Sequence, residues 1–278
     1  MKSNMPSALD QIKELHRETT RGAKEGLAFR YFSRPLASTI LYFIKDTGIT
    51  PNQVTILSLL VGILGSIVHL AMLSWGGLIL GGMLFMLAHV LDALDGQLAR
   101  LKKAGSVVGM HFDFFIDEIK AYLMYLALGL RLLWQFGSPG TGHLPADTPL
   151  ASPTWLLEQL PIAFSPELMF YWLLLGLLSL AIGLSCTQFF KRPEWKAAFP
   201  AATPALGIPS LPSRLLAGLE RIGHFLVDYP SYIIPLCLLN RVDVYILAYT
   251  IVVASYAIRA LLQMTIALWR VQPYGNRP

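Results

Sequence analysis

Two apolar stretches of this 278-residue chain each contain a pair of aspartates at helical spacing. Asp92 and Asp95 are three residues apart in HVLDALDGQLAR. Asp113 and Asp117 are four residues apart in GMHFDFFIDEIKAY. Residues at either spacing share one face of a helix. Because only the short basic connection LKKAGS separates the two stretches, we expect an antiparallel helix pair whose four carboxylates converge near one end.

Carboxylates in an apolar setting restrict the chemistry of such a site. Several of them cannot stay charged and unpaired in a low-dielectric environment, so they need protons or cations. Acidic oxygens without cysteine or a pair of histidines suit Mg²⁺ or Mn²⁺ rather than zinc. Two such ions can neutralise a pyrophosphate and promote a displacement at phosphorus. The aspartates therefore predict a metal-dependent phosphoryl chemistry that uses two ions.

Small residues and one arginine accompany the aspartates. Gly96 and Gly109 permit close approach of a backbone or a ligand. Ala99 keeps the wall of the site small, and the guanidinium of Arg100 matches the geometry of a phosphate. This pattern indicates a phosphate-containing substrate without naming it.

Together these residues form one continuous pattern, Asp92-x2-Asp95-Gly96-x2-Ala99-Arg100-x8-Gly109-x3-Asp113-x3-Asp117. It resembles the signature of the CDP-alcohol phosphotransferase (CDP-alcohol phosphatidyltransferase) family at every fixed position and in both gaps. The likeness extends to ITPNQVT before the pattern, to a six-span plan and to an interfacial N-terminal helix. It covers most of residues 30–268 and is specific across residues 92–117.

The resemblance implies a reaction and a set of roles. Such enzymes release CMP from a CDP-linked donor when an acceptor hydroxyl attacks the phosphorus beside the lipid or alcohol moiety. The likeness implies that Asp92, Asp95 and Asp113 hold the metals. It implies that Asp117 is the catalytic base and also touches a metal. The residues that would bind the CDP are Asp92, Gly96, Ala99, Arg100, Gly109, Asp113, Asn52 and Thr55. Asn52 and Thr55 can instead contact a neighbouring helix. A homodimer with a cavity open to the cytoplasm is also implied.

The composition is that of a membrane protein. The chain is 54% hydrophobic and 14% charged, whereas soluble domains carry about 25% charged residues. Its apolar blocks have membrane-spanning length. We predict an all-α integral membrane protein with six transmembrane helices, near residues 52–73, 77–100, 108–134, 168–190, 225–240 and 243–268. The predicted parts are a cytoplasmic or interfacial N-terminal segment (1–50), a transmembrane catalytic domain (51–270) and a cytoplasmic tail (271–278).

The N-terminal region leads into the first predicted span. RYFSRPLASTILYFIKDTG has apolar residues at roughly helical spacing and basic residues beside them, which indicates an amphipathic helix in the membrane interface. A cytosolic helix packed on the enzyme is the alternative. Thr50 and Gln53 then form a capping box, and Pro51 fits the first helical position. No cleavable signal peptide is evident, so the first span would itself direct insertion.

Basic residues decide the predicted orientation. In a six-span arrangement, the Lys and Arg residues of the N-terminal region, of 100–103, of 191–221 and of the tail all fall on one side, whereas 136–167 has none. By the positive-inside rule, both termini and the aspartates face the cytoplasm. If the protein is bacterial, the membrane is the inner one. Cys186 and Cys237 lie in apolar blocks and predict neither a disulfide nor a metal site.

The leading functional prediction is an enzyme of phospholipid-type biosynthesis. It would transfer a phosphatidyl or other phospho-alcohol group from a CDP-linked donor to an alcohol. Lys120, Arg259 and Lys191 are the candidate acceptor-binding residues, and a basic pocket favours a phosphorylated polyol such as glycerol phosphate or inositol phosphate. RPLASTILYFIKDTGITPNQVT also resembles family members that act on phosphorylated inositol.

Other interpretations stay open at this point. Lys120 can instead pair with the aspartates, Arg259 can form an interhelical ion pair, and Lys191 can reach lipid headgroups. The donor can be a CDP-linked polar head group and the acceptor a lipid alcohol. An ion-coupled membrane transporter would explain the acids, but not the Gly, Ala and Arg at fixed spacing, and the chain shows no internal repeat. A nucleic-acid partner is not expected.

Overall fold

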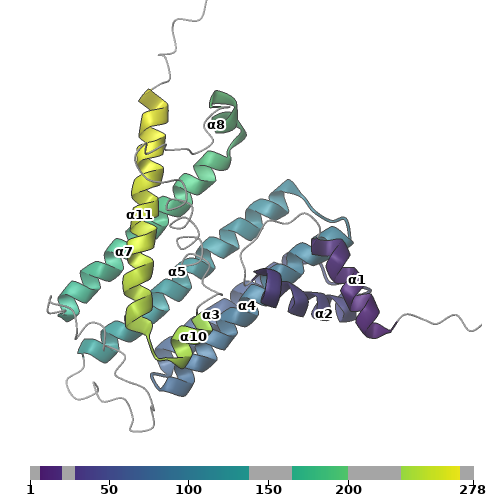
Figure 1. The fold of residues 1–278 in the computed structure, drawn as a ribbon, viewed down its shortest axis with the longest axis horizontal. Helices are drawn as coiled ribbons and strands as arrows, with labels where there is room; N and C mark the ends of the chain where they lie inside the picture. The colour runs from purple at the N-terminus through teal and green to yellow at the C-terminus, as the bar shows by residue number, and fades with distance from the viewer. Residues whose placement is uncertain (1–6, 21–28, 138–164, 200–232, 270–278) are drawn as a thin grey trace, which may run out of the picture. The chain divides into compact units, whose positions relative to one another are not determined.

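The computed structural model describes residues 7–20, 29–137, 165–199 and 233–269, and every regular element in those ranges is a helix (Figure 1). This confirms the predicted all-α class for the described part of the chain. The chain divides into two compact units. The first contains the described residues 7–20, 29–137 and 233–244, and the second contains 165–199 and 245–269.

The first unit is organised around α3. Its elements are α1 (Ala8–Thr20), the π-helical turn η1 (Phe29–Ser33), α2 (Arg34–Ile44), α3 (Pro51–Ala71), α4 (Trp75–Leu101), α5 (Val107–Gly137) and α10 (Ile233–Leu238). Helix α3 packs against both α4 and α5, while α2 and α10 pack on α4. The helices that carry the aspartates therefore share α3 as a common support.

Helix α3 begins at the predicted capping box. The Thr50 hydroxyl accepts a hydrogen bond from the Gln53 backbone N–H, and the Gln53 side chain accepts one from the Thr50 backbone N–H. Pro51 occupies the first helical position, where its missing N–H costs nothing. These local contacts define where α3 starts, four residues before Thr55.

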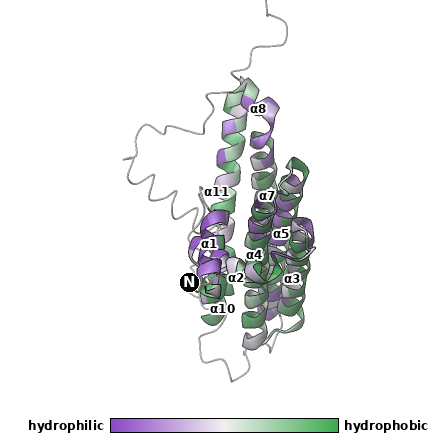
Figure 2. Ribbon diagram, turned by 90° about the vertical axis from the view of Figure 1, so that its right-hand side faces the viewer, coloured by the Kyte–Doolittle hydropathy of each residue, from purple (hydrophilic) through white to green (hydrophobic). Residues whose placement is uncertain are grey.

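The burial pattern of α3 is the reverse of that in a water-soluble helix. Its buried residues are mostly small or polar, and they are Val54, Thr55, Ser58, Gly62, Gly65, Ser66 and His69. Large aliphatic side chains such as Leu57, Leu60 and Leu64 are exposed, and α3 is hydrophobic over most of its length (Figure 2). Small residues let helices approach closely in a membrane, so the exposed aliphatic face of α3 suits contact with lipid.

Among the described residues, four helices are long and apolar enough to cross a membrane: α3, α4, α7 and α11. They correspond to the first, second, fourth and sixth predicted spans, and their length and composition are those of a membrane protein. The third predicted span corresponds to α5, which has 31 residues and several charged ones. Of the fifth predicted span, only 233–240 lies within the described residues, where α10 is six residues long. The six-span count stays a prediction.

Helix α2 contacts the rest of the unit with one face. Ala37 and Leu41 are buried and pack with Leu94 and Leu98 of α4. Other large apolar side chains of this region remain exposed, namely Tyr31, Phe32, Leu36 and Phe43. The helix thus packs on the protein, as the alternative interpretation had it, and also presents an apolar surface. Its position at the membrane interface stays a prediction.

The second unit contains α7 (Pro166–Lys191), α8 (Pro193–Ala198) and most of α11 (Val242–Trp269). Ser165 caps α7 by accepting a hydrogen bond from the backbone N–H of Leu168 at 3.2 Å. The hydroxyl oxygens of Thr187 and Tyr256 are 2.8 Å apart. A Cβ at Gly183 would lie 3.1 Å from the Tyr256 ring, so this glycine permits the close contact between α7 and α11.

A buried arginine ties α5 to the end of α3. The side chain of Arg131 is fully buried. Its Nη1 donates to the carbonyls of His69 at 3.0 Å and Met72 at 2.7 Å. Its Nη2 donates to the carbonyls of Leu73 at 2.6 Å and Ser74 at 2.8 Å. The last carbonyls of a helix have no hydrogen-bond donor within the helix. Arg131 of α5 supplies this donor to the carbonyls of the α3–α4 turn.

We predict that Arg131→Met destabilises the protein by roughly 3 kcal/mol or more, because four carbonyls of the α3–α4 turn lose charge-assisted hydrogen bonds from a buried guanidinium. Thermal melting in detergent measures the effect. Arg17→Met is the matched control, since it removes an exposed pair with Glu14 that contributes little. Equal melting temperatures for the two variants would contradict the stabilising role of Arg131.

Candidate metal and active site

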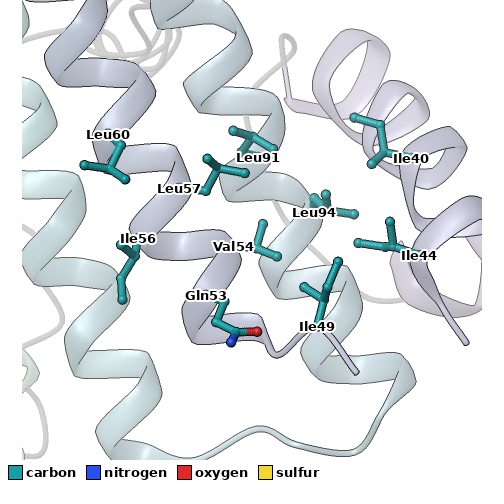
Figure 3. A pocket seen from close by; sticks show the side chains of 10 residues that line it. All are labelled: Ile40, Ile44, Ile49, Gln53, Val54, Ile56, Leu57, Leu60, Leu91 and Leu94. Atoms are coloured by element: carbon teal, nitrogen blue, oxygen red, sulfur yellow. The ribbon is translucent and has the colours of Figure 1, made fainter. Parts of the chain in front are cut away.

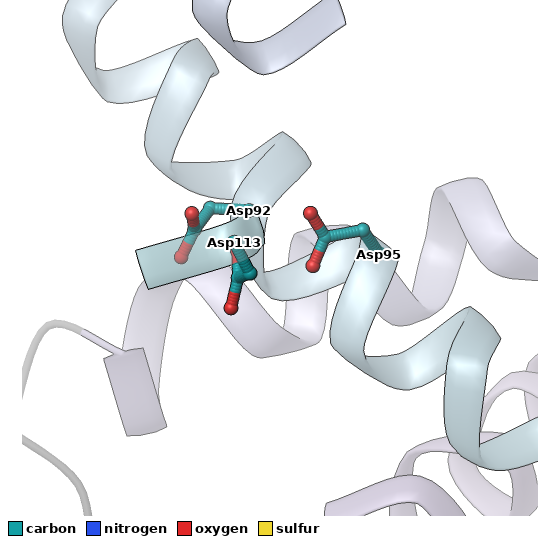
Figure 4. A group of neighbouring side chains, drawn as sticks. All are labelled: Asp92, Asp95 and Asp113. Carbon is teal, nitrogen blue, oxygen red and sulfur yellow. The ribbon is translucent and has the colours of Figure 1, made fainter. Parts of the chain in front are cut away.

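Three of the four predicted aspartates meet between α4 and α5. Asp92 and Asp95 come from α4, and Asp113 comes from α5 (Figure 4). Each offers one carboxylate oxygen, and the three oxygens lie within 4.8 Å of one another. The convergence predicted from helical spacing is therefore confirmed for these three residues, which we call the aspartate triad.

The triad is suited to a hard cation. Asp95 is buried, and its Oδ2 accepts a hydrogen bond from the Thr55 hydroxyl at 2.5 Å. Asp113 Oδ1 is buried and has no hydrogen-bond partner among the described residues. A buried carboxylate oxygen without a partner is costly. A divalent ion bound by three carboxylates would remove this cost, so the donor set fits Mg²⁺ or Mn²⁺.

Asp117 is not one of the three converging aspartates, although its carboxyl group shares a hydrogen bond with that of Asp92. It lies one turn after Asp113 on α5, and its side chain is 44% exposed, compared with 11% for that of Asp92. Its Oδ1 is 2.8 Å from Lys120 Nζ. The four carboxylates are therefore not equivalent, and Asp117 is more open to solvent and to a ligand than Asp92.

Lys120 is buried against the aspartates. Its side chain is 3% exposed, and its Nζ lies 2.7 Å from Asp92 Oδ1 as well as 2.8 Å from Asp117 Oδ1. The same ammonium donates to the Ser58 hydroxyl at 2.9 Å. Of the two interpretations of Lys120, pairing with the acidic cluster is confirmed. Its use in acceptor binding stays a prediction.

Several predicted CDP-binding residues lie beside the triad. The guanidinium of Arg100 lies over Gly96, where a Cβ would be 3.4 Å from Nη2. Gly109 lies near the start of α3, and a Cβ there would be 3.5 Å from Asn52 Oδ1. The backbone N–H of Gly109 donates to Ser106 Oγ at 2.9 Å. The structure thus brings Asn52 to Gly109 and Arg100 to Gly96, while nucleotide binding by these residues stays a prediction.

Two α3 residues support the acidic groups. Thr55, for which the sequence left open the nucleotide or a neighbouring helix, donates its hydroxyl to Asp95 of α4, which confirms the second alternative. Ser58 was missed, although it accepts from Lys120 and donates to the Ala88 carbonyl at 2.9 Å. The available signal was the stripe of small or polar residues Thr55, Ser58 and Gly62 on an otherwise apolar helix. Such a stripe marks the face that packs against other helices.

The two remaining candidates belong to the second unit. Lys191 is exposed at the end of α7, and Arg259 lies in α11. A role of these two residues in acceptor binding stays a prediction.

A separate apolar groove lies in the first unit between α2, α3 and α4 (Figure 3). Its volume is about 420 Å³. Apart from Gln53 it is lined by aliphatic side chains, namely Ile40, Ile44, Ile49, Val54, Ile56, Leu57, Leu60, Leu91 and Leu94. None of the four aspartates lines this groove, and its lining suits hydrocarbon rather than phosphate.

Comparison with known proteins finds one family for the part of the chain that contains the triad. Residues 48–157 match the model of the family described as CDP-alcohol phosphatidyltransferase. This range includes Asn52, Thr55, all four aspartates and Lys120. The resemblance seen in the sequence is thereby confirmed.

Curated relatives of the chain are named as synthases or as a combined transferase and synthase. The chain is 37% identical over 93 residues to archaetidylinositol phosphate synthase of Pyrococcus horikoshii, which covers 33% of this chain and 47% of that protein. It is 29% identical over 139 residues to bifunctional IPC transferase and DIPP synthase of Aquifex aeolicus, covering 49% of this chain and 31% of that protein. The chain thus spans less than half the length of these relatives.

We predict that Thr55→Val weakens Mn²⁺ binding to the purified protein by roughly tenfold or more, because residues that orient a metal ligand typically contribute that much affinity. Electron paramagnetic resonance of added Mn²⁺ measures the affinity. Thr55→Ser retains the hydroxyl and is the matched control. Unchanged Mn²⁺ affinity in Thr55→Val would show that Asp95 needs no orientation by Thr55.

Proposed function

We propose that this chain, whose residues 48–157 match the model of the CDP-alcohol phosphatidyltransferase family, transfers a phosphatidyl or other phospho-alcohol group from a CDP-linked donor to an alcohol. The observation that carries the proposal is the meeting of Asp92, Asp95 and Asp113 within 4.8 Å. These residues stand in the family's pattern of spacing. The products would be a phosphodiester and CMP.

The triad would hold the metal, with Asp117 as a further ligand. When bound, Mg²⁺ or Mn²⁺ neutralises the pyrophosphate and makes the phosphorus easier to attack. Asp113 Oδ1, which is buried without a partner among the described residues, supports this use of the triad. Thr55 would keep Asp95 oriented toward the ion. Two ions per site remain our proposal.

Asp117 would act as the general base. Of the two aspartates that contact Lys120, Asp117 has the more exposed side chain. This exposure suits a group that must meet an incoming acceptor. The carboxylate takes the proton from the acceptor hydroxyl while the hydroxyl oxygen forms a bond to phosphorus. The bond between that phosphorus and the CMP oxygen breaks, and CMP leaves with the electron pair.

The CDP would bind along the ends of α3, α4 and α5. Arg100 and Asn52 are exposed, and a guanidinium fork matches the oxygens of a phosphate. Gly96 and Gly109 leave room beside these two side chains. Ala99 and Thr55 complete the set, together with the ligands Asp92 and Asp113.

The acceptor we propose is a phosphorylated polyol, with inositol phosphate ahead of glycerol phosphate. The printed name of the Pyrococcus horikoshii relative, archaetidylinositol phosphate synthase, supports this choice. Lys191 and Arg259 are the proposed ligands of its phosphate. Lys120 is a weaker candidate, because it already contacts two carboxylates and a hydroxyl.

The membrane arrangement we propose has six spans, with α2 in the interface and both termini and the site facing the cytoplasm. The four apolar helices and the exposed apolar side chains beside α2 support it. A homodimer and, in a bacterium, location in the inner membrane complete the proposal.

Release of CMP tests this function directly. Purified protein with Mg²⁺ or Mn²⁺ and a CDP-lipid is offered inositol phosphate, glycerol phosphate and their unphosphorylated counterparts. We expect CMP only with a phosphorylated polyol, and none after chelation of the metal. A CDP-linked polar head group with a lipid alcohol tests the reverse assignment. No CMP with any pair, together with ion flux in liposomes, would replace the enzyme by a transporter.

We predict that Asp117→Asn lowers turnover by roughly 10²–10⁴-fold, the usual contribution of a general base, while metal-dependent CDP binding is retained. Asp92→Asn should instead weaken donor binding, because a ligand of the triad is lost. CMP release and binding of labelled CDP measure the two effects. Glu118→Gln is the matched control on α5 and should keep its activity. Near-normal turnover in Asp117→Asn would remove Asp117 as the base.

A further inference from the structure

Lys120 is placed as a cation that belongs to the acidic site. Its ammonium has three N–H donors, and the acceptors around it include oxygens of Asp92, Asp117 and Ser58. Its stem lies along α3, where a Cβ at Gly62 would be 3.4 Å from Lys120 Cγ. The lysine is therefore held at both ends of its side chain, and its charge points into the cluster of aspartates.

The position of this ammonium excludes a metal ion between the same oxygens. Lys120 Nζ is 2.7 Å from Asp92 Oδ1 and 2.8 Å from Asp117 Oδ1. A Mg²⁺ ion that joined these two oxygens would lie about 2.1 Å from each, in the space that the ammonium takes. A metal ion in that space and the Lys120 ammonium would also repel each other strongly, because the site is partly buried.

The triad and Asp117 therefore differ in how favourably they bind a first metal ion. Asp113 Oδ1 in the triad is buried without a partner among the described residues, so an ion there removes a cost. Asp117 already has the lysine as its counter-charge. Asp92 is shared by both parts, as a member of the triad and as a partner of Lys120. A first ion gains more at the triad than at Asp117.

We propose that Lys120 is a built-in counter-cation that imposes an order on metal binding: a first divalent ion enters the triad, and a second enters at Asp117 only when the ammonium releases that carboxylate. The inference rests on the metal site of the proposed function. It also implies a form of control, because Asp117 is the proposed base. The carboxylate exchanges the lysine for the metal, and thereby becomes ready for catalysis, only when the site is loaded.

Titration of metal-depleted protein with Mn²⁺, followed by electron paramagnetic resonance, tests the order. We expect the wild type to bind one ion per chain well and a second about tenfold or more weakly. Lys120→Met should bring the second affinity up by about tenfold. Lys120→Arg keeps the charge and should retain the wild-type order. Lys120→Met combined with Asp117→Asn should lose the gain, because the second ion loses its ligand.

Stability provides a second readout that does not depend on activity. Without metal, Lys120→Met leaves buried carboxylates uncompensated, and its melting temperature should fall by roughly 5–10 °C. Saturating Mn²⁺ should restore most of this loss, and so should the added Asp117→Asn change. Should Lys120→Met fail to fold, Ser58→Ala removes one acceptor that holds the ammonium in place and should raise the second Mn²⁺ affinity by a few-fold. Lys13→Met, at an exposed position of α1, is the control.

Three results would overturn the inference. These are equal affinities for both ions in the wild type, an unchanged second affinity when Lys120 or Ser58 is altered, or a gain that persists without the Asp117 carboxylate. CMP release by the wild type is measured separately. CMP release together with one of these three results would contradict only the role of Lys120. The expected order of Mn²⁺ binding without CMP release would contradict only the proposed reaction. Absence of Mn²⁺ binding defeats both.

Discussion

The burial of carboxylates between apolar helices is the constraint on which the rest of this structure depends. A buried charge needs a partner of opposite charge or hydrogen bonds from its surroundings. Here Asp95 accepts from a hydroxyl of α3, and Asp92 and Asp117 share the ammonium of Lys120. One oxygen, Asp113 Oδ1, keeps no partner among the described residues. The compensation is thus incomplete at the triad, where a divalent ion would complete it.

Helix α3 makes this arrangement possible. Its inner face has small and hydroxyl side chains that approach α4 and α5, and its outer face has large aliphatic ones. This reversal is stable only where the surroundings are hydrocarbon, because exposed aliphatic side chains then lose nothing. At the other end of the helix, Arg131 satisfies four carbonyls of the α3–α4 turn from α5. The support for the aspartates is therefore held at both ends.

The family pattern accounts for only part of this site. It covers the aspartates, two glycines, an alanine and an arginine, and the chain matches it at every position. Lys120 and Ser58 are not among the fixed positions of that pattern. Lys120 nevertheless contacts Asp92 and Asp117, and Ser58 accepts a hydrogen bond from Lys120. Lys120 changes the net charge of the cluster, and Ser58 helps to hold Lys120 in place, while the aspartates themselves stay the same.

The sequence by itself determined the local elements: the capped start of α3 at Thr50, the helical pairs of aspartates and the apolar blocks. Each of these depends on contacts within about one turn of helix or on simple length and composition. Only the tertiary structure decided that Lys120 pairs with Asp92 and Ser58, residues 28 and 62 positions away. It also decided that Thr55 supports Asp95, 40 positions away. The spacing of residues on one helix predicts which side chains share a face, but the partner across an interface depends on how two helices pack.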